Sequence, residues 1–347
     1  MRVAILYDGV AHTWTAADVR EVLEAVTQIA RALRRAGHAV DRVPVRSGLR
    51  WLTRCREADV VFNLCESVNA VGRYESLVAG AIELSGVPFT GAKPEAISLC
   101  HRKAVANALL ASRGLPVPPW VVPDGRKVPG GFPLPAIVKP AAEDASVGID
   151  QGSVVTTRRA LNERVALLSA EHPEVLVQQY IHGRELAVGF VGSEALPVSE
   201  IDFSGMPNGA WPILSFSAKW EVGGVEDLGS RPVCPAQIPK ALADRLTTLA
   251  REAWQAVGGS GYGRVDLRLD ASGQPWILEV NPNPDITDSA GLARMAEAIG
   301  WSYQDLILRI LDAAFADAQQ ADSVAVMMAE ARSHADRRVA DEQQKLA

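Results

Sequence analysis

The sequence predicts an α/β protein in which a parallel sheet is followed by antiparallel strands. Residues 2–7 form an apolar run typical of a buried strand, and residues 16–36 carry apolar side chains at helical spacing. Two more strand patterns follow, AVDRVPV and ADVVFNL. A strand, a helix and a strand in succession build a parallel sheet with helices on its faces. Farther along, ELAVGFVG and LPVSEIDF alternate as paired antiparallel strands do.

The order of the remaining elements predicts further structural units. Helix 74–85 and a short VPFTG strand close a first unit near residue 95. Gly114 ends helix 102–113, and a Pro-rich segment leads into the next unit. The elements expected after it are strands 135–140 and 175–181 around helix 158–170, helix 239–257, strands 264–269 and 276–281, and helices 289–299 and 302–317.

Composition and charge exclude several classes of protein. The chain has 347 residues, 48% of them hydrophobic, and a formal net charge of −6. This length fits two or three domains, and an acidic chain is a poor partner for nucleic acid phosphates. No apolar run reaches the ~20 residues of a membrane helix, and MRVAILYDGV predicts a first strand rather than a signal peptide. We expect a cytoplasmic protein that binds neither nucleic acid nor membranes, with four cysteines as reduced structural thiols.

A polar, Gly-rich segment interrupts the periodic pattern between residues 204 and 233. A structureless connection of that length in a compact enzyme is usually a functional lid. We therefore expect this segment to close over a site.

The segment GYGRVDLRLDASGQPWILEVNPNPD is the most informative in the chain. Two strands are joined by the turn-rich DASGQP, and side chains alternate between the two faces of a strand. The residues expected to share a face are Arg264, Asp266 and Arg268 on the first strand, and Ile277, Glu279 and Asn281 on the second.

The pairing of these strands decides which side chains meet. A turn that is symmetric about Ser272–Gly273 places Asp266 opposite Glu279. The same register places Arg264 opposite Asn281, and a bulge in the turn would shift it by one residue.

Two carboxylates that face each other across an antiparallel pair repel, so we expect a cation between them. Asp, Glu and Asn offer hard oxygen donors without His or Cys, and this set suits Mg²⁺. The alternative is a surface hairpin with solvated charges. Pro282 and Pro284 favour the metal site, because they end the strand and hold Asn281 and Asn283 extended.

Six blocks of the chain resemble those of one enzyme family and occur in the same order. GRVDLRLD with WILEVNPNP resembles the metal-binding segment of ATP-grasp ligases, most closely the D-alanine–D-alanine ligase branch. The resemblance covers roughly residues 1–317 and is specific from residue 86 onward. The other blocks that carry it are GVPFTG (86–91), HRKAVANALLASRGLPVPPW (101–120), AIVKP (136–140) with SVGI (146–149), VLVQQYIHGREL (175–186), and SAKW to VCPA (217–236).

The resemblance implies an ATP-grasp fold, with an α/β start and an α+β arrangement in the ATP-grasp part. It implies an N-terminal Rossmann-like domain over residues 1–95 and a central small α/β domain over residues 96–182. A C-terminal antiparallel-sheet domain with the metal site is expected over residues 183–317. Residues 318–347 are expected to form a helical or disordered tail.

The resemblance also implies a binding site for ATP. Lys103 and Lys139 are expected to contact the ATP phosphates, and Lys219 to reach the γ-phosphate. Ser146 lies in the loop expected to cover the phosphates. Gln178 stands where the family typically has Glu, so contacts to the nucleoside can differ. The other positions that match ATP-binding residues are Tyr180, Ile181, Glu185 and Trp220.

Catalytic and metal-binding roles follow from the same resemblance. Arg264 matches the arginine that stabilises negative charge on the transferring phosphoryl group and the tetrahedral intermediate. Lys219 and Ser146 complete the implied catalytic set. Asp266, Glu279 and Asn281 match the ligands of two Mg²⁺ ions, with Mn²⁺ as an alternative ion.

The positions expected to bind substrate depart from the family pattern. The Glu-containing motif that holds the first substrate's ammonium is absent from DGVAHTWTAADVREV. The family's SPGMTSxS reads NPDITDSA, so Asp285 replaces a glycine and should disfavour a carboxylate on the acceptor. Glu66 has loop hydrogen bonding or helix capping as its alternative role. The candidate substrate-binding residues are Glu66, Asn283, Asp285 and Ser289.

The expected reaction converts a small-molecule carboxylate to an acyl phosphate with ATP and then joins it to an amine. Two versions stay open: a D-alanine–D-alanine ligase-like enzyme of altered specificity, and an authentic D-alanine–D-alanine ligase of peptidoglycan synthesis. A third hypothesis of another class is a non-catalytic ATP-binding regulatory protein. Homodimerisation also stays open.

Overall fold

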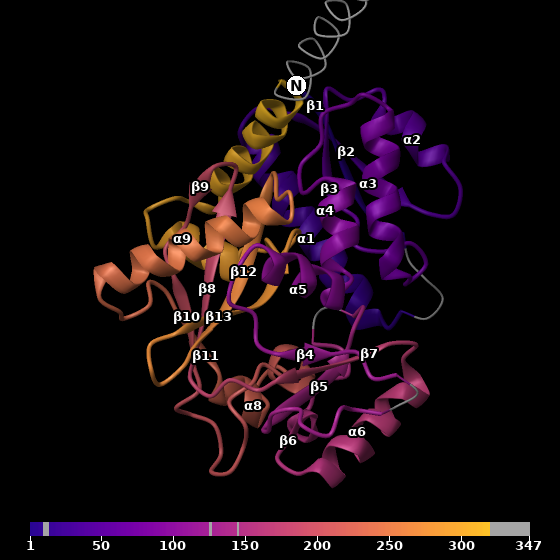
Figure 1. The fold of residues 1–347 in the computed structure, drawn as a ribbon. Coiled ribbons are helices and arrows are strands. Elements are labelled where there is room, and N and C mark those ends of the chain that lie inside the picture. Colours follow the sequence, from indigo (N-terminus) through magenta and orange to yellow (C-terminus); the bar gives the residue numbers. More distant parts are fainter. Residues whose placement is uncertain (10–13, 125–126, 144–145, 320–347) are drawn as a thin grey trace, which may run out of the picture.

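Three separate sheets organise the protein (Figure 1). The computed structural model describes residues 1–9, 14–124, 127–143 and 146–319. A parallel sheet has the order β2-β1-β3, a second sheet the order β4-β7-β5-β6, and a third the order β11-β10-β8-β12-β13 with β9 paired to β8. Most of the expected tail, residues 320–347, lies outside the described residues.

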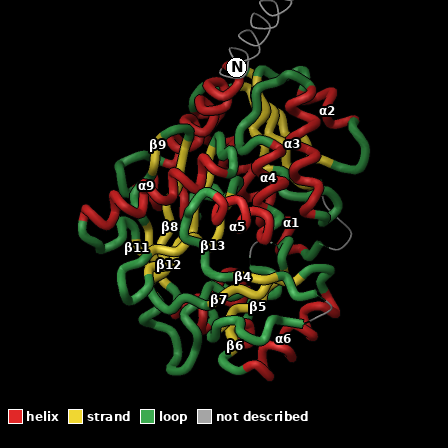
Figure 2. The backbone as a smooth tube through the Cα atoms, viewed as in Figure 1, coloured by secondary structure: helices red, strands yellow, loops and turns green. Residues whose placement is uncertain are grey.

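The N-terminal sheet is buried on both faces, as the first part of the sequence predicts. Val3 and Ile5 face one core, and Ala4 and Leu6 face another. Figure 2 shows helices packed around these strands. The segment VPFTG forms only one parallel bridge, between Val61 and Phe89, rather than the expected strand. The elements of this part are β1 Arg2–Asp8, α1 Ala16–Arg35, β2 Ala39–Val45, α2 Arg50–Cys55, β3 Val60–Leu64, η1 Gly72–Tyr74, α3 Glu75–Leu84 and α4 Pro94–Cys100.

The central sheet is antiparallel, and helix α6 packs on one of its faces. Val138 and Val177 pack against Leu161 and Val165 of α6, because alternate residues of β5 and β7 point to that side. The elements of this part are α5 Lys103–Ser112, β4 Trp120–Val121, β5 Ala136–Pro140, η2 Gln151–Ser153, β6 Val154–Val155, α6 Arg158–Glu171 and β7 Val175–Gln179.

The C-terminal sheet has one apolar and one polar face. Val265, Leu267 and Phe190 pack into a core with Trp254 of α9. Helical residues 303–319 return to the N-terminal part, where Ile307 packs in the same core as β1 and α1. The remaining elements are β8 Arg184–Val191, β9 Glu194–Ala195, β10 Ser199–Asp202, α7 Phe216–Trp220, α8 Val225–Gly229, β11 Arg231–Val233, α9 Lys240–Ala256, β12 Tyr262–Leu269, β13 Pro275–Asn281 and α10 Gly291–Glu297.

A bulge in β13 corrects one detail of the predicted hairpin. The register changes between Asp266, which lies opposite Glu279, and Leu267, which lies opposite Ile277. Leu278 is therefore the extra residue, and Ile277 packs in the apolar core instead of sharing the face of Glu279. An extra residue in one strand changes the face of the sheet to which the side chains on its far side point.

The segment from 204 to 233 is not structureless, contrary to expectation. It contains the short helices α7 and α8 and the strand β11. The Ser215 side chain accepts a hydrogen bond from the backbone N–H of Ala218 and so caps α7. Helices of five residues are too short to produce a periodic sequence pattern, so the sequence does not predict them.

Two expectations from composition can be compared with the described part of the chain. All four cysteines are free, and Cys55, Cys65 and Cys100 are buried. No helix within the described ranges combines the length and apolar character needed to span a membrane.

Candidate active site

The polar face of the β12–β13 hairpin gathers the predicted metal-binding side chains. Asp266 lies opposite Glu279 and Arg264 opposite Asn281, so the predicted register is confirmed. The bulge at Leu278 lies on the turn side of these pairs and leaves them intact. Four polar side chains therefore share one patch of the sheet.

Cations lie directly on the two carboxylates of this patch. The Arg264 guanidinium donates from Nε and Nη2 to the two oxygens of Asp266, at 2.6 and 2.9 Å. The Lys103 Nζ lies 2.8 Å from Glu279 Oε1. Burial opposes the charge on Arg264, but the Asp266 carboxylate outweighs it and raises the arginine pKa above its ordinary value.

The charge of Lys219, in the 204–233 segment, interacts with the charges of the same patch. Lys219 lies at the C-terminal end of α7 and is exposed to solvent. Surrounding protein atoms lower the pKa of Lys219, as does the Arg264 guanidinium, while the carboxylates of Asp266, Glu279 and Glu185 raise it.

Two more predicted ATP residues lie on the face of the central sheet opposite to helix α6. Gln178 lies opposite Ile137, and Lys139 lies two residues farther along β5, so all three share a face. This is the face opposite to helix α6, because Val138 and Val177 point to the helix. Both polar side chains are buried, and the Gln178 Nε2 has no hydrogen-bond partner among the described residues.

The connection between the central and C-terminal sheets contains the predicted hinge. Tyr180 and Ile181 are buried there, and Glu185 begins the polar face of β8. Arg268 of β12 lies directly opposite Glu185 and pairs with it at 2.6 Å. Sequence alternation placed Arg268 on this face but gave no indication of its partners.

The predicted phosphate-covering loop contacts the 204–233 segment. Ser146 has a positive φ of 62°, which is rare outside glycine, and its Oγ donates to the carbonyl of Leu214 at 2.8 Å. The backbone N–H of Phe216 donates to the carbonyl of Ile149. Trp220, at the end of α7, is 41% exposed.

Asn283, one of the predicted substrate-binding residues, contacts helix α3 and the chain that follows it. Its Nδ2 donates to Glu75 Oε1 at 2.6 Å, and its Oδ1 accepts from the Ala92 backbone at 3.1 Å. His101 lies 2.7 Å from the other oxygen of Glu75. Sequence reasoning gave Glu75 no role, although it links α3 to the loop that follows β13.

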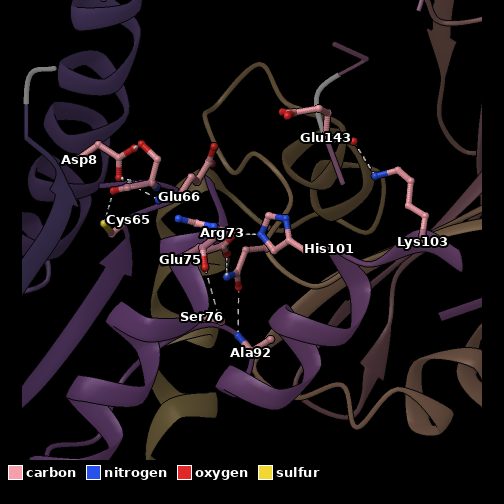
Figure 3. A network of polar contacts seen from close by, with 12 residues as sticks. Asp8, Cys65, Glu66, Arg73, Glu75, Ser76, Ala92, His101, Lys103 and Glu143 are labelled. Carbon is pink, nitrogen blue, oxygen red and sulfur yellow. Dashed lines mark hydrogen bonds and ion pairs between the residues drawn. The ribbon is translucent and has the colours of Figure 1, made fainter. Parts of the chain in front are cut away.

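Glu66, Asp285 and Ser289 are exposed. The backbone of Glu66 donates to Asp8 at 2.9 Å, as Figure 3 shows. Asp285 accepts hydrogen bonds from the backbone and hydroxyl of Thr287, at 2.8 and 2.9 Å. Their substrate-binding roles stay predictions.

The hairpin patch fits magnesium by the chemistry of its donors. It offers two carboxylates and one amide oxygen, and Mg²⁺ binds few protein carboxylates together with water and phosphate oxygens. Within the described residues no cluster of three His, Cys, Asp or Glu could hold an ion alone. A metal here would take its remaining ligands from water and phosphate oxygens.

A family model shows which family the chain belongs to. A family model described as "D-ala D-ala ligase C-terminus" matches residues 109–312, more than half of the 347 residues. The chain belongs to the D-alanine–D-alanine ligase family. Members of this ATP-grasp family are ligases that form an amide bond, so the chain is an enzyme of this type.

Related proteins agree with this assignment. A D-alanine–D-alanine ligase of Bordetella petrii is 36% identical over 253 residues, covering 70% of this chain and 73% of that protein. One of Bordetella avium is 32% identical over 322 residues, covering 89% and 93%.

A solved structure shows that the D-alanine–D-alanine ligase family fold extends over most of the chain. The D-alanine–D-alanine ligase of Bacillus anthracis, complexed with ATP, matches with a TM-score of 0.71 and 19% identity. The match covers 92% of this chain and 99% of that one, so the expected ATP-grasp fold is confirmed.

Proposed function

We propose that this ligase uses ATP to convert a small-molecule carboxylate to an acyl phosphate, which an amine then attacks, and that its substrates differ from two D-alanines. The observation that supports the chemistry most strongly is the hairpin patch. There Arg264, Asp266 and Glu279 lie with Lys103 of another segment, and the charge of Lys219 acts on them. Phosphoryl transfer needs this kind of positioning and charge compensation.

Each side chain has a role that follows from its place. Lys103, Lys139 and Lys219 neutralise the phosphates, and Ser146 holds the covering loop to the 204–233 segment. Arg264 stabilises charge that develops on the phosphoryl group and the tetrahedral intermediate. Asp266, Glu279 and Asn281 would hold Mg²⁺, or Mn²⁺, which supplies additional positive charge to the phosphates.

The nucleoside is proposed to lie at the hinge. Glu185 would accept from the ribose, and Gln178, Tyr180 and Ile181 would contact the base, with Trp220 near the phosphates. Exclusion of water by the 204–233 segment would protect the acyl phosphate from hydrolysis.

The altered specificity rests on the loop after β13. Asp285 is an exposed anion at the position of a family glycine, and its side chain already accepts two hydrogen bonds from Thr287. The competing candidate is an authentic D-alanine–D-alanine ligase, since relatives at 32–36% identity have that name. A cytoplasmic location suits either enzyme, because ATP is available there.

A coupled assay of ADP release tests the proposal on a panel of carboxylates and amines, singly and in pairs. Release only when a carboxylate and an amine are both present supports the ligase reaction. Full release with D-alanine alone supports the authentic enzyme. ATP binding without turnover on every pair would instead favour a regulatory protein.

A further inference from the structure

We propose that Arg268 is a positioning residue that holds the hinge, Glu185 and Pro212 of the 204–233 segment in the arrangement that binds ATP. This inference rests on the proposed ATP site. Arg268 lies on β12, two residues beyond Asp266, and is only 3% exposed. No role in the reaction follows from its sequence position alone.

The guanidinium of Arg268 contacts two separate segments, residues 180–185 and Pro212. Its Nη1 donates to the Tyr180 hydroxyl at 3.1 Å and to the carbonyls of Ile181 at 3.3 Å and Gly183 at 3.5 Å. Its Nη2 donates to Glu185 Oε2 at 2.6 Å and to the carbonyl of Pro212. The ring of Tyr180 also lies 5.2 Å from the guanidinium carbon.

Only an arginine can serve all of these acceptors at once. A guanidinium has five N–H donors in a planar fork, whereas a lysine ammonium is a single point with three donors. A buried cation is also stable only where a carboxylate compensates its charge, and Glu185 does so here. The pair in turn fixes the orientation of Glu185, the carboxylate proposed to bind the ribose.

The same contact network continues to η2, which follows the phosphate-covering loop. The Tyr180 hydroxyl lies 3.3 Å from the carbonyl of Pro212, and the Trp211 ring packs edge-on against Tyr180 at 5.2 Å. On its other side, the Trp211 backbone donates to Gln151 at 2.7 Å. Removal of the guanidinium would therefore loosen the hinge and the 211–213 segment together, and ATP affinity should fall.

Arg184 provides a matched control in the same sheet. It pairs with Glu200 through two contacts, from Nε at 2.6 Å and from Nη2, and lies opposite Leu269, next to Arg268. Its other contact is with the carbonyl of Gln237, away from the hinge and Pro212. Replacing Arg184 removes an arginine–glutamate pair without touching the proposed ATP site.

The test measures the affinity of the full chain for AMP-PNP with Mg²⁺ by calorimetry, for wild type, Arg268→Met and Arg184→Met. We expect the Kd to rise about tenfold or more in Arg268→Met and to stay within about twofold in Arg184→Met. In turnover assays the KM for ATP should rise about tenfold in Arg268→Met while kcat changes less than about threefold. A purely structural role would lower the active fraction, and hence kcat, without changing Kd.

Arg268→Lys keeps the test decisive if Arg268→Met does not fold. Lysine retains the charge next to Glu185 but cannot reach the hinge carbonyls and Pro212 together, so we expect an intermediate Kd. A Kd equal to that of wild type in Arg268→Lys, or in a folded Arg268→Met, overturns the positioning role alone. Absence of AMP-PNP binding in the wild type overturns the proposed function and this inference with it.

Discussion

The two carboxylates on the polar face of β12–β13 each contact a cation that belongs to the protein. Arg264 pairs with Asp266, and Lys103 pairs with Glu279. Both pairs keep partial contact with solvent. Under the proposed function, the phosphates of a nucleotide would attract Arg264 and Lys103 away from the carboxylates, which would then bind a metal together with phosphate oxygens.

Replacement of Glu279 tests this arrangement at the level of one residue. Glu279→Gln retains an acceptor for Lys103 but removes the charge that a divalent ion needs, so we expect turnover to be abolished in a folded protein. Affinity for Mn²⁺ in the presence of AMP-PNP should fall about tenfold or more. Glu194→Gln, which loses only an exposed pair with Arg309, serves as the control. An active Glu279→Gln enzyme would contradict the metal assignment.

Replacement of Asp285 tests the proposed specificity. We expect Asp285→Gly to accept a wider range of acceptors that carry a carboxylate, because a fixed anion is removed. Asp285→Asn distinguishes the effect of the charge from that of the loop conformation, because the asparagine amide oxygen can still accept the hydrogen bond from Thr287. A substrate panel measured by mass spectrometry gives the result, and a specificity unchanged in both variants would refute this role.

The sequence predicted the residues of the patch better than their partners. Strand alternation placed Asp266 and Glu279 on a common face, because periodicity is a local property. It could not show that Glu75 contacts Asn283, since the two are 208 positions apart in the chain. The contacts of Arg268 could not be predicted for the same reason, because Ile181, Glu185 and Pro212 are 87, 83 and 56 positions away from it.

At the level of elements, the turn of the β12–β13 hairpin is held by Asp270. Its carboxylate accepts from the backbone and hydroxyl of Ser272, the backbone of Gln274 and the indole N–H of Trp276. The hydrogen bond from the Ser272 hydroxyl contributes most, followed by that from Trp276, and together they lower the Asp270 pKa to about 2. The turn fixes the register that places Asp266 opposite Glu279.

A pH-dependent stability follows from this turn. Folding lowers the pKa of Asp270. The ionised carboxylate therefore contributes fully to the stability of the folded protein above the ordinary pKa of 3.8, and this contribution is lost as the pH falls toward 2. We expect Asp270→Asn to be less stable than wild type at pH 7, with a difference in unfolding free energy that narrows between about pH 4 and pH 2. Urea unfolding at a series of pH values measures this difference in stability between wild type and Asp270→Asn. Asp244→Asn, on exposed α9, should show no such narrowing, and a gap independent of pH would contradict the account.

Element prediction succeeded where periodicity extends over several turns and failed for short elements. The long helix α9 lies within one residue of its predicted ends at 239 and 257. The bulge at Leu278 could not be predicted, because it depends on which neighbouring side chains enter the core. Helices α7 and α8 depend on caps and contacts rather than on a repeated apolar pattern.

At the level of the whole molecule, Glu75 joins the N-terminal sheet to the active-site hairpin. It is 6% exposed, begins helix α3, and contacts both His101 and Asn283. Asn283 follows the proposed metal ligand Asn281 by two residues. The position of the hairpin end thus depends on an element far away in the sequence.

Loss of Glu75 should therefore affect both stability and metal binding. Glu75→Ala leaves the Asn283 amide without its acceptor, and an unsatisfied buried donor costs about 1–3 kcal/mol. We expect a lower urea midpoint and weaker Mn²⁺ binding in the presence of AMP-PNP. Glu83→Ala, on the same helix, loses only a surface pair with Lys93 at 3.4 Å and should cost about 0–1 kcal/mol. Equal effects of the two substitutions would show that Glu75 does not couple these parts.

The arrangement of the parts was predictable from the sequence only through its resemblance to a known family. Elements and their order follow from local patterns, but the return of helical residues 303–319 to the N-terminal sheet does not. Helix α5 likewise packs against α9, although the prediction assigns it to the central domain. The domain boundaries at residues 95 and 182 stay proposals.

A crystal structure of the full chain with AMP-PNP and Mn²⁺ tests the central claim most directly, because anomalous scattering locates the ion. The account predicts manganese about 2.0–2.2 Å from oxygens of Asp266, Glu279 and Asn281, bridged to the phosphates. Lys103 and Arg264 should then have left the carboxylates for the nucleotide. Bound nucleotide without manganese at the hairpin, and with both ion pairs intact, would contradict it.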